Sequence, residues 1–121
     1  MSDDQTWFAV RLIMESEHPE EDVEDRLFEE KIILVYAPTE EAARQKAVRF
    51  GQAAEEEYTN PDGKLVKWVF REVLDVKPLF DNVIEDGAEV YYSLLSEEDV
   101  AYLRRSLRAD VQLADTSATA R

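Results

Sequence analysis

Two stretches near the start of the chain are rich in aromatic and β-branched residues and contain no Gly or Pro, a pattern typical of β-strands. The first, Thr6–Glu15, is apolar on both alternating sides, which favours a central strand covered on both faces of a sheet. The second, Leu27–Ala37, begins with polar alternation and ends in an apolar run. The polar connection between them is too short for an ordinary helical crossover, so we expect antiparallel neighbours.

A helix is predicted after the second strand, from Thr39 to about Tyr58. Thr39 is a suitable N-cap, and two acidic residues follow it where the helix dipole favours negative charge. An apolar stripe at spacings of three and four residues consists of Ala43, Ala47, Phe50 and Ala54. Because most of the stripe is alanine, we expect this helix to lie close to the sheet, with Phe50 in the core.

The second half of the chain repeats the order of two strands and a helix. The strands are predicted over Leu65–Val76 and Ala88–Leu95. In the strand Leu65–Val76, strict alternation places five apolar residues and Glu72 on one face. The apolar residues are Val66, Trp68, Phe70, Leu74 and Val76. The second helix begins at Ser96, a cap residue followed three positions later by an acid. Its apolar stripe consists of Val100, Leu103, Leu107 and Val111.

These elements predict an α+β domain with a mainly antiparallel four-stranded sheet, in the order strand-strand-helix-strand-strand-helix. One helix packs on one sheet face. The other face keeps apolar residues that either the second helix or another copy of the protein must cover, and we expect a homodimer. The expected boundaries are a disordered start over residues 1–5, a single domain over 6–113 and a flexible tail over 114–121.

The charge balance excludes several classes of partner. The chain has 28 acidic and 14 basic residues, a formal net charge of −14 at pH 7. Phosphate backbones and anionic lipids repel such a chain, because its basic residues form only small clusters beside acidic neighbours. We therefore expect no nucleic-acid partner and no membrane partner. The acidic start does not resemble a secretory signal, and no apolar stretch is long enough to span a bilayer, so we predict a cytoplasmic protein.

Rare residue types exclude much catalytic chemistry. The chain has no cysteine, one histidine and three glycines. The lack of cysteine excludes disulfides and thiolate metal sites, and the single histidine excludes most zinc and triad chemistry. Three glycines are too few for a phosphate-cradling loop. The Gly-x-Ser-x-Gly nucleophile motif is also missing. We expect no cofactor and favour a protein without enzymatic activity.

The strongest concentration of charge is the segment from Glu15 to Glu30, in which nine acidic residues accompany Arg26 alone as a basic residue. Such a field accelerates the docking of a basic protein partner. The residues assigned to this partner-binding surface are Glu20, Glu21, Asp22, Glu24 and Asp25. A hard-cation site is an alternative, although the segment lacks the glycine and the ligand spacing of the familiar calcium loop. A solvated loop that only increases solubility is the third alternative.

Two single residues have alternative interpretations. His18, before Pro19, is either an exposed loop residue or a general base or metal ligand. Glu72 lies between apolar neighbours, where it forms a buried or edge ion pair with Arg11 or serves as a catalytic carboxylate. The aromatic residues Trp7, Trp68, Tyr91 and Tyr92 either belong to the core or line a ligand groove.

Three segments together resemble a bacterial family of small uncharacterised proteins, domain of unknown function 4288. They are Trp7–Leu12 with the following Glu15, then Phe28–Val35 running into Ala37–Ala42, and finally Glu85–Tyr91. The resemblance covers about residues 6 to 95 and implies no activity and no catalytic residues. The chain departs from the family's compact pattern in its acidic segment and in its additional C-terminal helix from Glu97.

Size and charge together favour a non-enzymatic protein-binding module that self-associates. An immunity or inhibitor-like protein that neutralises a basic partner is one form of this function, by analogy of charge and size alone. The alternative is a small-ligand-binding or carboxylate-dependent enzyme domain with a pocket between sheet and helix.

Overall fold

The structure, a computed structural model, describes residues 4–22, 26–81 and 83–116, with side chains described as far as Arg108. This part of the chain divides into two compact units, one ending at Tyr91 and the other beginning at Tyr92. The predicted disordered start and flexible tail lie largely outside the described residues. The predicted domain boundary at residue 113 stays a prediction.

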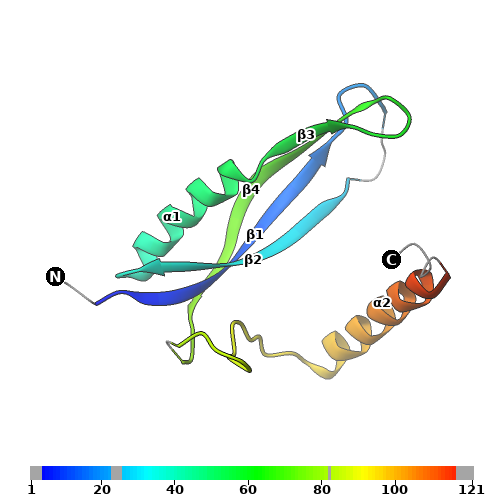
Figure 1. The fold of residues 1–121 in the computed structure, drawn as a ribbon. Coiled ribbons are helices and arrows are strands. Elements are labelled where there is room, and N and C mark those ends of the chain that lie inside the picture. Colours follow the sequence, from blue (N-terminus) through cyan, green and yellow to red (C-terminus); the bar gives the residue numbers. More distant parts are fainter. Residues whose placement is uncertain (1–3, 23–25, 82, 117–121) are drawn as a thin grey trace. The chain divides into compact units, whose positions relative to one another are not determined.

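The first unit is a four-stranded antiparallel sheet with one helix against it (Figure 1). The strands follow the spatial order β2-β1-β4-β3, so β1 is central, as its apolar sides predict. The elements are β1 (Thr6–Glu17), β2 (Phe28–Ala37), α1 (Glu40–Ala53), β3 (Glu56–Thr59) and β4 (Leu65–Pro78). The predicted mixed α and β class and the predicted antiparallel four-stranded sheet are confirmed.

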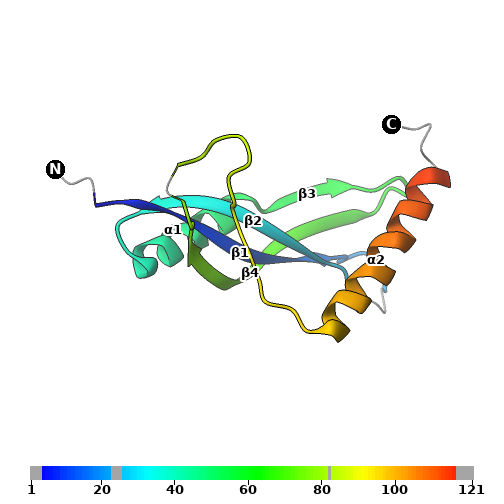
Figure 2. The ribbon, with the colours of Figure 1, turned by 90° about the horizontal axis from the view of Figure 1, so that it is seen from below.

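The identity of the fourth strand is predicted wrongly. Residues 88–95 form no strand, and the predicted helix ends at Ala53, which leaves Tyr58 in the short β3. β3 pairs with β4 through a tight turn, where Gly63 has φ +79° and Asn60 Oδ1 accepts two backbone N–H groups. β4 therefore has a neighbour on both edges. The segment after β4 makes a turn at Gly87, and as far as Tyr91 it lies on the sheet face opposite α1 (Figure 2).

The core lies between the sheet and α1. Its buried members are Phe8, Val10, Leu12, Val35, Ala37, Ala43, Ala47 and Val76. Thr39 caps α1 as predicted, because its side chain accepts a hydrogen bond of 3.0 Å from the backbone N–H of Ala42.

The apolar stripe of α1 differs from the prediction toward the C-terminal end of the helix. The buried helix residues are Ala43, Ala47 and Gly51, at a regular spacing of four residues. Phe50 is 46% exposed, so its predicted place in the core is wrong. A Cβ atom on Gly51 would lie 2.9 Å from Phe70 Cγ and closer to two other ring atoms. The small residues thus allow the close approach of helix and sheet that the alanines predict.

Two β-bulges change the alternation of β4. The register against β1 shifts twice, so Arg71 and Leu74 are extra residues in β4. Each bulge moves the side chains that follow it to the opposite face. The β4 residues that pack in the core are Phe70, Val73 and Val76. The predicted common face for Phe70 and Leu74 is therefore wrong, and Leu74 is exposed.

The second unit contains α2 (Glu97–Thr116). Its start is a reciprocal capping box, as the sequence predicts: the Asp99 N–H donates to Ser96 Oγ at 3.1 Å, and the Ser96 N–H donates to Asp99 Oδ2 at 3.0 Å. Val100, Leu103 and Leu107 follow at helical spacing on one side of the helix. Leu103 and Leu107 are nevertheless exposed.

Candidate functional site

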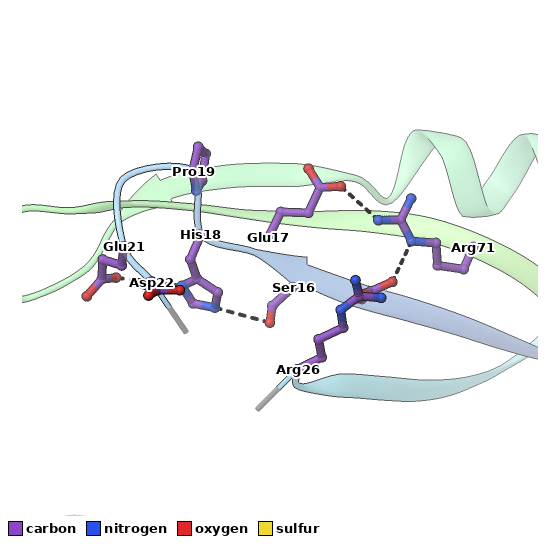
Figure 3. A pocket seen from close by; sticks show the side chains of 9 residues that line it. Ser16, Glu17, His18, Pro19, Glu21, Asp22, Arg26 and Arg71 are labelled. Atoms are coloured by element: carbon purple, nitrogen blue, oxygen red, sulfur yellow. Dashed lines mark hydrogen bonds and ion pairs between the residues drawn. The ribbon is translucent and has the colours of Figure 1, made fainter. Parts of the chain in front are cut away.

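A pocket of about 390 Å³ lies where β1 ends and the acidic segment begins (Figure 3). β1 stops at Glu17 because the chain turns at Pro19, which cannot donate a hydrogen bond to a strand ladder. The pocket is lined by Glu15, Ser16, Glu17, His18, Pro19, Glu21, Asp22, Arg26 and Arg71. It therefore combines carboxylates, guanidinium groups, the sole imidazole and a hydroxyl.

A buried carboxylate with two arginines forms one wall of the pocket. Glu15 is only 7% exposed, and its carboxylate lies 2.7 Å from Arg71 Nε and 3.2 Å from Arg26 Nη1. Arg71, the extra residue of one β4 bulge, also donates to Glu17 at 2.7 Å. These hydrogen bonds raise the pKa of Arg71, with the bond to Glu15 as the largest cause. The burial of Glu15 is therefore offset by charge pairing.

His18 stands between a hydroxyl and a carboxylate in the same pocket. Its Nε2 lies 3.2 Å from Ser16 Oγ, and its Nδ1 lies 3.7 Å from Glu21 Oε2 (Figure 3). Among the described residues, Nδ1 is the only buried side-chain nitrogen or oxygen atom without a hydrogen-bond partner. Of the two interpretations of His18, the exposed loop residue is therefore wrong, because the side chain is only 22% exposed and has defined neighbours.

The acidic segment attaches the β1–β2 connection to the β3–β4 turn. Glu20 Oε1 accepts a hydrogen bond of 2.7 Å from the backbone N–H of Leu65, and Glu21 Oε2 accepts one of 3.3 Å from Asn60 Nδ2. Two of the five acids assigned to a partner surface thus make internal contacts. Asp22 is exposed beside the pocket. Glu24 and Asp25 lie outside the described residues, and partner binding by the segment stays a prediction.

The predicted ion pair between Arg11 and Glu72 is wrong. Glu72 is paired with Ile13 and is exposed on the sheet face away from α1. It lies on this face because the bulge at Arg71 reverses the alternation of side chains along β4. Arg11 instead donates from Nε to Glu30 at 2.6 Å and from Nη1 to the Tyr91 hydroxyl at 3.1 Å. The hydrogen bond to Glu30 is the main cause of the raised pKa of Arg11.

The segment after β4 covers only part of this second face. The Tyr91 hydroxyl donates to Asp75 at 3.0 Å, and Arg11 and Lys77 both lie over the Tyr91 ring. Along β2, however, Phe28, Ile32 and Tyr36 remain exposed. Apolar surface is therefore accessible on the sheet, as it is on α2.

The described residues contain neither a metal-binding cluster nor a membrane-spanning helix. That part of the chain holds no group of three or more His, Cys, Asp or Glu side chains suited to a metal ion. It also contains no helix with the length and apolar character needed to cross a membrane.

Sequence reasoning did not predict that a pocket forms at the end of β1. It identified the acidic segment but left Ser16 and Arg71 unassigned, and it gave His18 no defined partner. The alternate positions of Ser16 and His18 at the end of a strand, with Glu21 three residues later, were the available signal. Nothing in the pattern of β4 indicated the bulge that brings Arg71 to Glu15.

Comparisons with known proteins give one match. No curated protein and no solved structure matches the chain. The family described as Domain of unknown function (DUF4288) matches residues 7–92, which is well over half of the chain and includes α1 and all of the sheet except Thr6. The chain therefore belongs to the DUF4288 family, as the three resembling segments predict.

Proposed function

We propose that the chain is a protein-binding module that self-associates. In this arrangement, α2 of one copy lies on the sheet face opposite α1 in a second copy. The observation that carries this proposal is the presence of two exposed apolar surfaces. Ile32 is 45% exposed on the sheet, and Leu107 is 58% exposed on α2. An amphipathic helix is stabilised when its apolar stripe packs against another apolar surface, and contiguous exposed apolar surface usually marks an interface.

The lengths of the two surfaces are compatible. The 20 residues of α2 correspond to a helix of about 30 Å. The ten residues of β2 correspond to a strand of about 33 Å. A helix laid along β2 would therefore contact Phe28, Ile32 and Tyr36, which recur at every fourth residue on one face. Two copies exchanging α2 would form two identical contacts about a twofold axis.

Local charge supports the same arrangement despite the net charge of −14, which opposes association. Arg104 and Arg108 border the apolar stripe of α2 by helical spacing, and neither pairs with a described acidic side chain. On the sheet face, Glu72 is likewise exposed and pairs with no described cation. Opposite charges at the rim of an interface favour encounter and fix orientation.

A basic protein is the second partner that we propose for the same module, bound at the acidic end of the sheet. The support is an excess of carboxylates over guanidinium groups around the pocket, with Asp22 exposed beside it. An immunity or inhibitor-like role would be one use of this surface, and the charge and size of the chain are the grounds for it.

The test of self-association is size exclusion with light scattering at low and high salt. We expect the unaltered chain to have twice the mass of one chain, and Leu103→Glu/Leu107→Glu to have the mass of one chain. Ile32→Glu should act in the same way from the sheet side. Tyr102→Glu is the matched control, since Tyr102 is exposed on the other side of α2 and should leave the doubled mass unchanged.

Two results would overturn the proposal. One is a single-chain mass for the unaltered protein at every concentration. The other is equal dissociation by Tyr102→Glu and by the double variant, which would show that added negative charge, and not loss of the apolar stripe, separates the copies.

A further inference from the structure

We propose that Ser16, His18 and Glu21 form a nucleophile, base and orienting carboxylate that accept an acyl group in the pocket at the end of β1. This is an activity beyond protein binding and does not depend on self-association. The inference rests on three observations: the distances among the three side chains, the unsatisfied nitrogen of His18 and the pocket that opens beside them.

The distances follow the pattern of an activated nucleophile. Ser16 Oγ lies 3.2 Å from His18 Nε2, which is within hydrogen-bond reach for a hydroxyl and its general base. His18 Nδ1 lies 3.7 Å from the carboxylate of Glu21, on the far side of the ring. Ser16 and His18 are two residues apart at the end of a strand, so their side chains leave the backbone on the same side. The order hydroxyl, imidazole, carboxylate defines this kind of site by geometry and not by position in the sequence.

The unsatisfied nitrogen argues against a purely structural role for the group. Nδ1 of His18 is buried and accepts or donates no hydrogen bond within the described residues. Burying a polar atom without a partner costs free energy, which a structural serine–histidine hydrogen bond alone does not recover. With its proton on Nδ1, the ring would direct that proton toward Glu21 and leave the Nε2 lone pair facing the Ser16 hydroxyl. This tautomer is the one that a general base requires.

The pocket limits the acyl compound by size and charge. Its volume of about 390 Å³ is that of a small-ligand site. Four carboxylates and two guanidinium groups line it, so anionic substrates are repelled, and a small neutral or cationic ester is favoured. The Arg26 side chain is 73% exposed at the rim and holds Glu15 by a 3.2 Å ion pair, so its N–H groups are the donors best able to turn toward a developing oxyanion.

The chemical steps balance without a cofactor. Ser16 Oγ attacks the carbonyl carbon of the ester while the hydroxyl proton passes to His18 Nε2. The bond to the alcohol oxygen breaks, and the departing alcohol takes that proton, which leaves an acyl ester on Ser16. Water then attacks the acyl carbon, gives its proton to His18, and releases the carboxylic acid as Ser16 Oγ is reprotonated. The sum is ester plus water giving acid plus alcohol.

The test uses the full chain and two neutral probes. Diisopropyl fluorophosphate should form one covalent adduct, which peptide mapping should locate at Ser16. p-Nitrophenyl acetate should be hydrolysed with saturation. Ser16→Ala should abolish both the adduct and the saturable rate, and His18→Gln should lower the rate by about 100-fold or more. Ser93→Ala, a change at an exposed serine outside the pocket, is the matched control and should react like the unaltered chain.

Glu21 is a positioning residue, and its test separates orientation of His18 from stability. Glu21→Gln keeps an oxygen that can accept the Asn60 hydrogen bond but removes the charge opposite Nδ1. We expect a lower kcat with KM unchanged, at an unchanged unfolding midpoint. The inference is overturned if folded protein carries no adduct at Ser16, or if Ser16→Ala hydrolyses the ester as fast as the unaltered chain. Either result leaves the self-association test untouched.

Discussion

The two faces of the sheet differ in kind. The face toward α1 is closed by small and branched apolar side chains, with Leu12 and Val10 essentially inaccessible to water. The opposite face mixes exposed Ile32 with a charged group in which Arg11 connects Glu30 to Tyr91. Both faces belong to the same strands, and successive residues of β1 alternate between them.

The difference shows which residues fix the fold and which are available for interaction. Burial of apolar surface is the dominant favourable contribution to folding, so the α1 face should carry most of the stability. Hydrogen bonds and ion pairs at the exposed face contribute less, since water competes for the same groups. Substitutions on the two faces should therefore separate in their effect on unfolding.

The largest effect is expected for Leu12→Ala on the α1 face. Leu12 is 1% exposed, and removing its side chain should leave a cavity that lowers the free energy of unfolding by about 3 kcal/mol. Ile32→Ala on the opposite face should lower it by less than about 1 kcal/mol, because that side chain already meets water. Urea denaturation of both variants in the Leu103→Glu/Leu107→Glu background removes any contribution from association.

An equal loss of unfolding free energy in Leu12→Ala and Ile32→Ala would contradict the expectation that the α1 face carries most of the stability. It would mean that the second face is covered within a single chain. Ile32→Val, a smaller truncation at the same position, would then show whether the loss follows the volume removed.

Gly51→Ala is expected to have the next largest effect on the free energy of unfolding. Two contributions to this free energy oppose each other, helix propensity and packing against β4. Alanine stabilises a helix interior by about 1 kcal/mol relative to glycine. The new methyl group, however, would overlap the ring of Phe70, and overpacking of this kind typically costs about 1–3 kcal/mol. We therefore expect a net loss of stability in thermal and urea unfolding.

The partner of that clash supplies the control. In a Phe70→Leu background the side chain is smaller, so Gly51→Ala should cost less than it does in the unaltered chain, and the double-variant cycle should show coupling between the two sites. A stabilising Gly51→Ala in the unaltered chain would show that α1 stands farther from β4 than the structure places it.

Local signals in the sequence were sufficient for much of the fold. The cap at Thr39, the capping box at Ser96 and the central position of β1 all depend on residues close together in the chain, and all three are confirmed. The wrong predictions concern features that depend on pairing between segments far apart in the sequence. Register shifts in β4 against β1 reversed the faces of Glu72 and Leu74, and no local pattern encodes such shifts.

The candidate site was predictable only in part, for the same reason. The acidic segment is visible in the sequence as a run of charged residues. Its internal contacts, however, are made with the β3–β4 turn, and the contact between Glu20 and Leu65 joins residues that are 45 positions apart. The pair of Glu15 and Arg71 spans 56 residues and depends on a bulge. Sequence reasoning therefore found the charged segment but not the pocket that the segment closes.

The smallest effect is expected for Phe50→Ala, which tests the rotation of α1 about its own axis. Phe50 is on the predicted stripe yet exposed, so its truncation removes only part of a buried side chain, and alanine regains about 0.5 kcal/mol of helix propensity. The free energy of unfolding should change by less than about 1 kcal/mol in urea. A loss of about 3 kcal/mol or more would place Phe50 in the core and turn Gly51 away from Phe70, which would also make Gly51→Ala harmless. Only one of residues 50 and 51 can point at the sheet. Phe50→Ala and Gly51→Ala are therefore two independent tests of the rotation of α1 about its own axis.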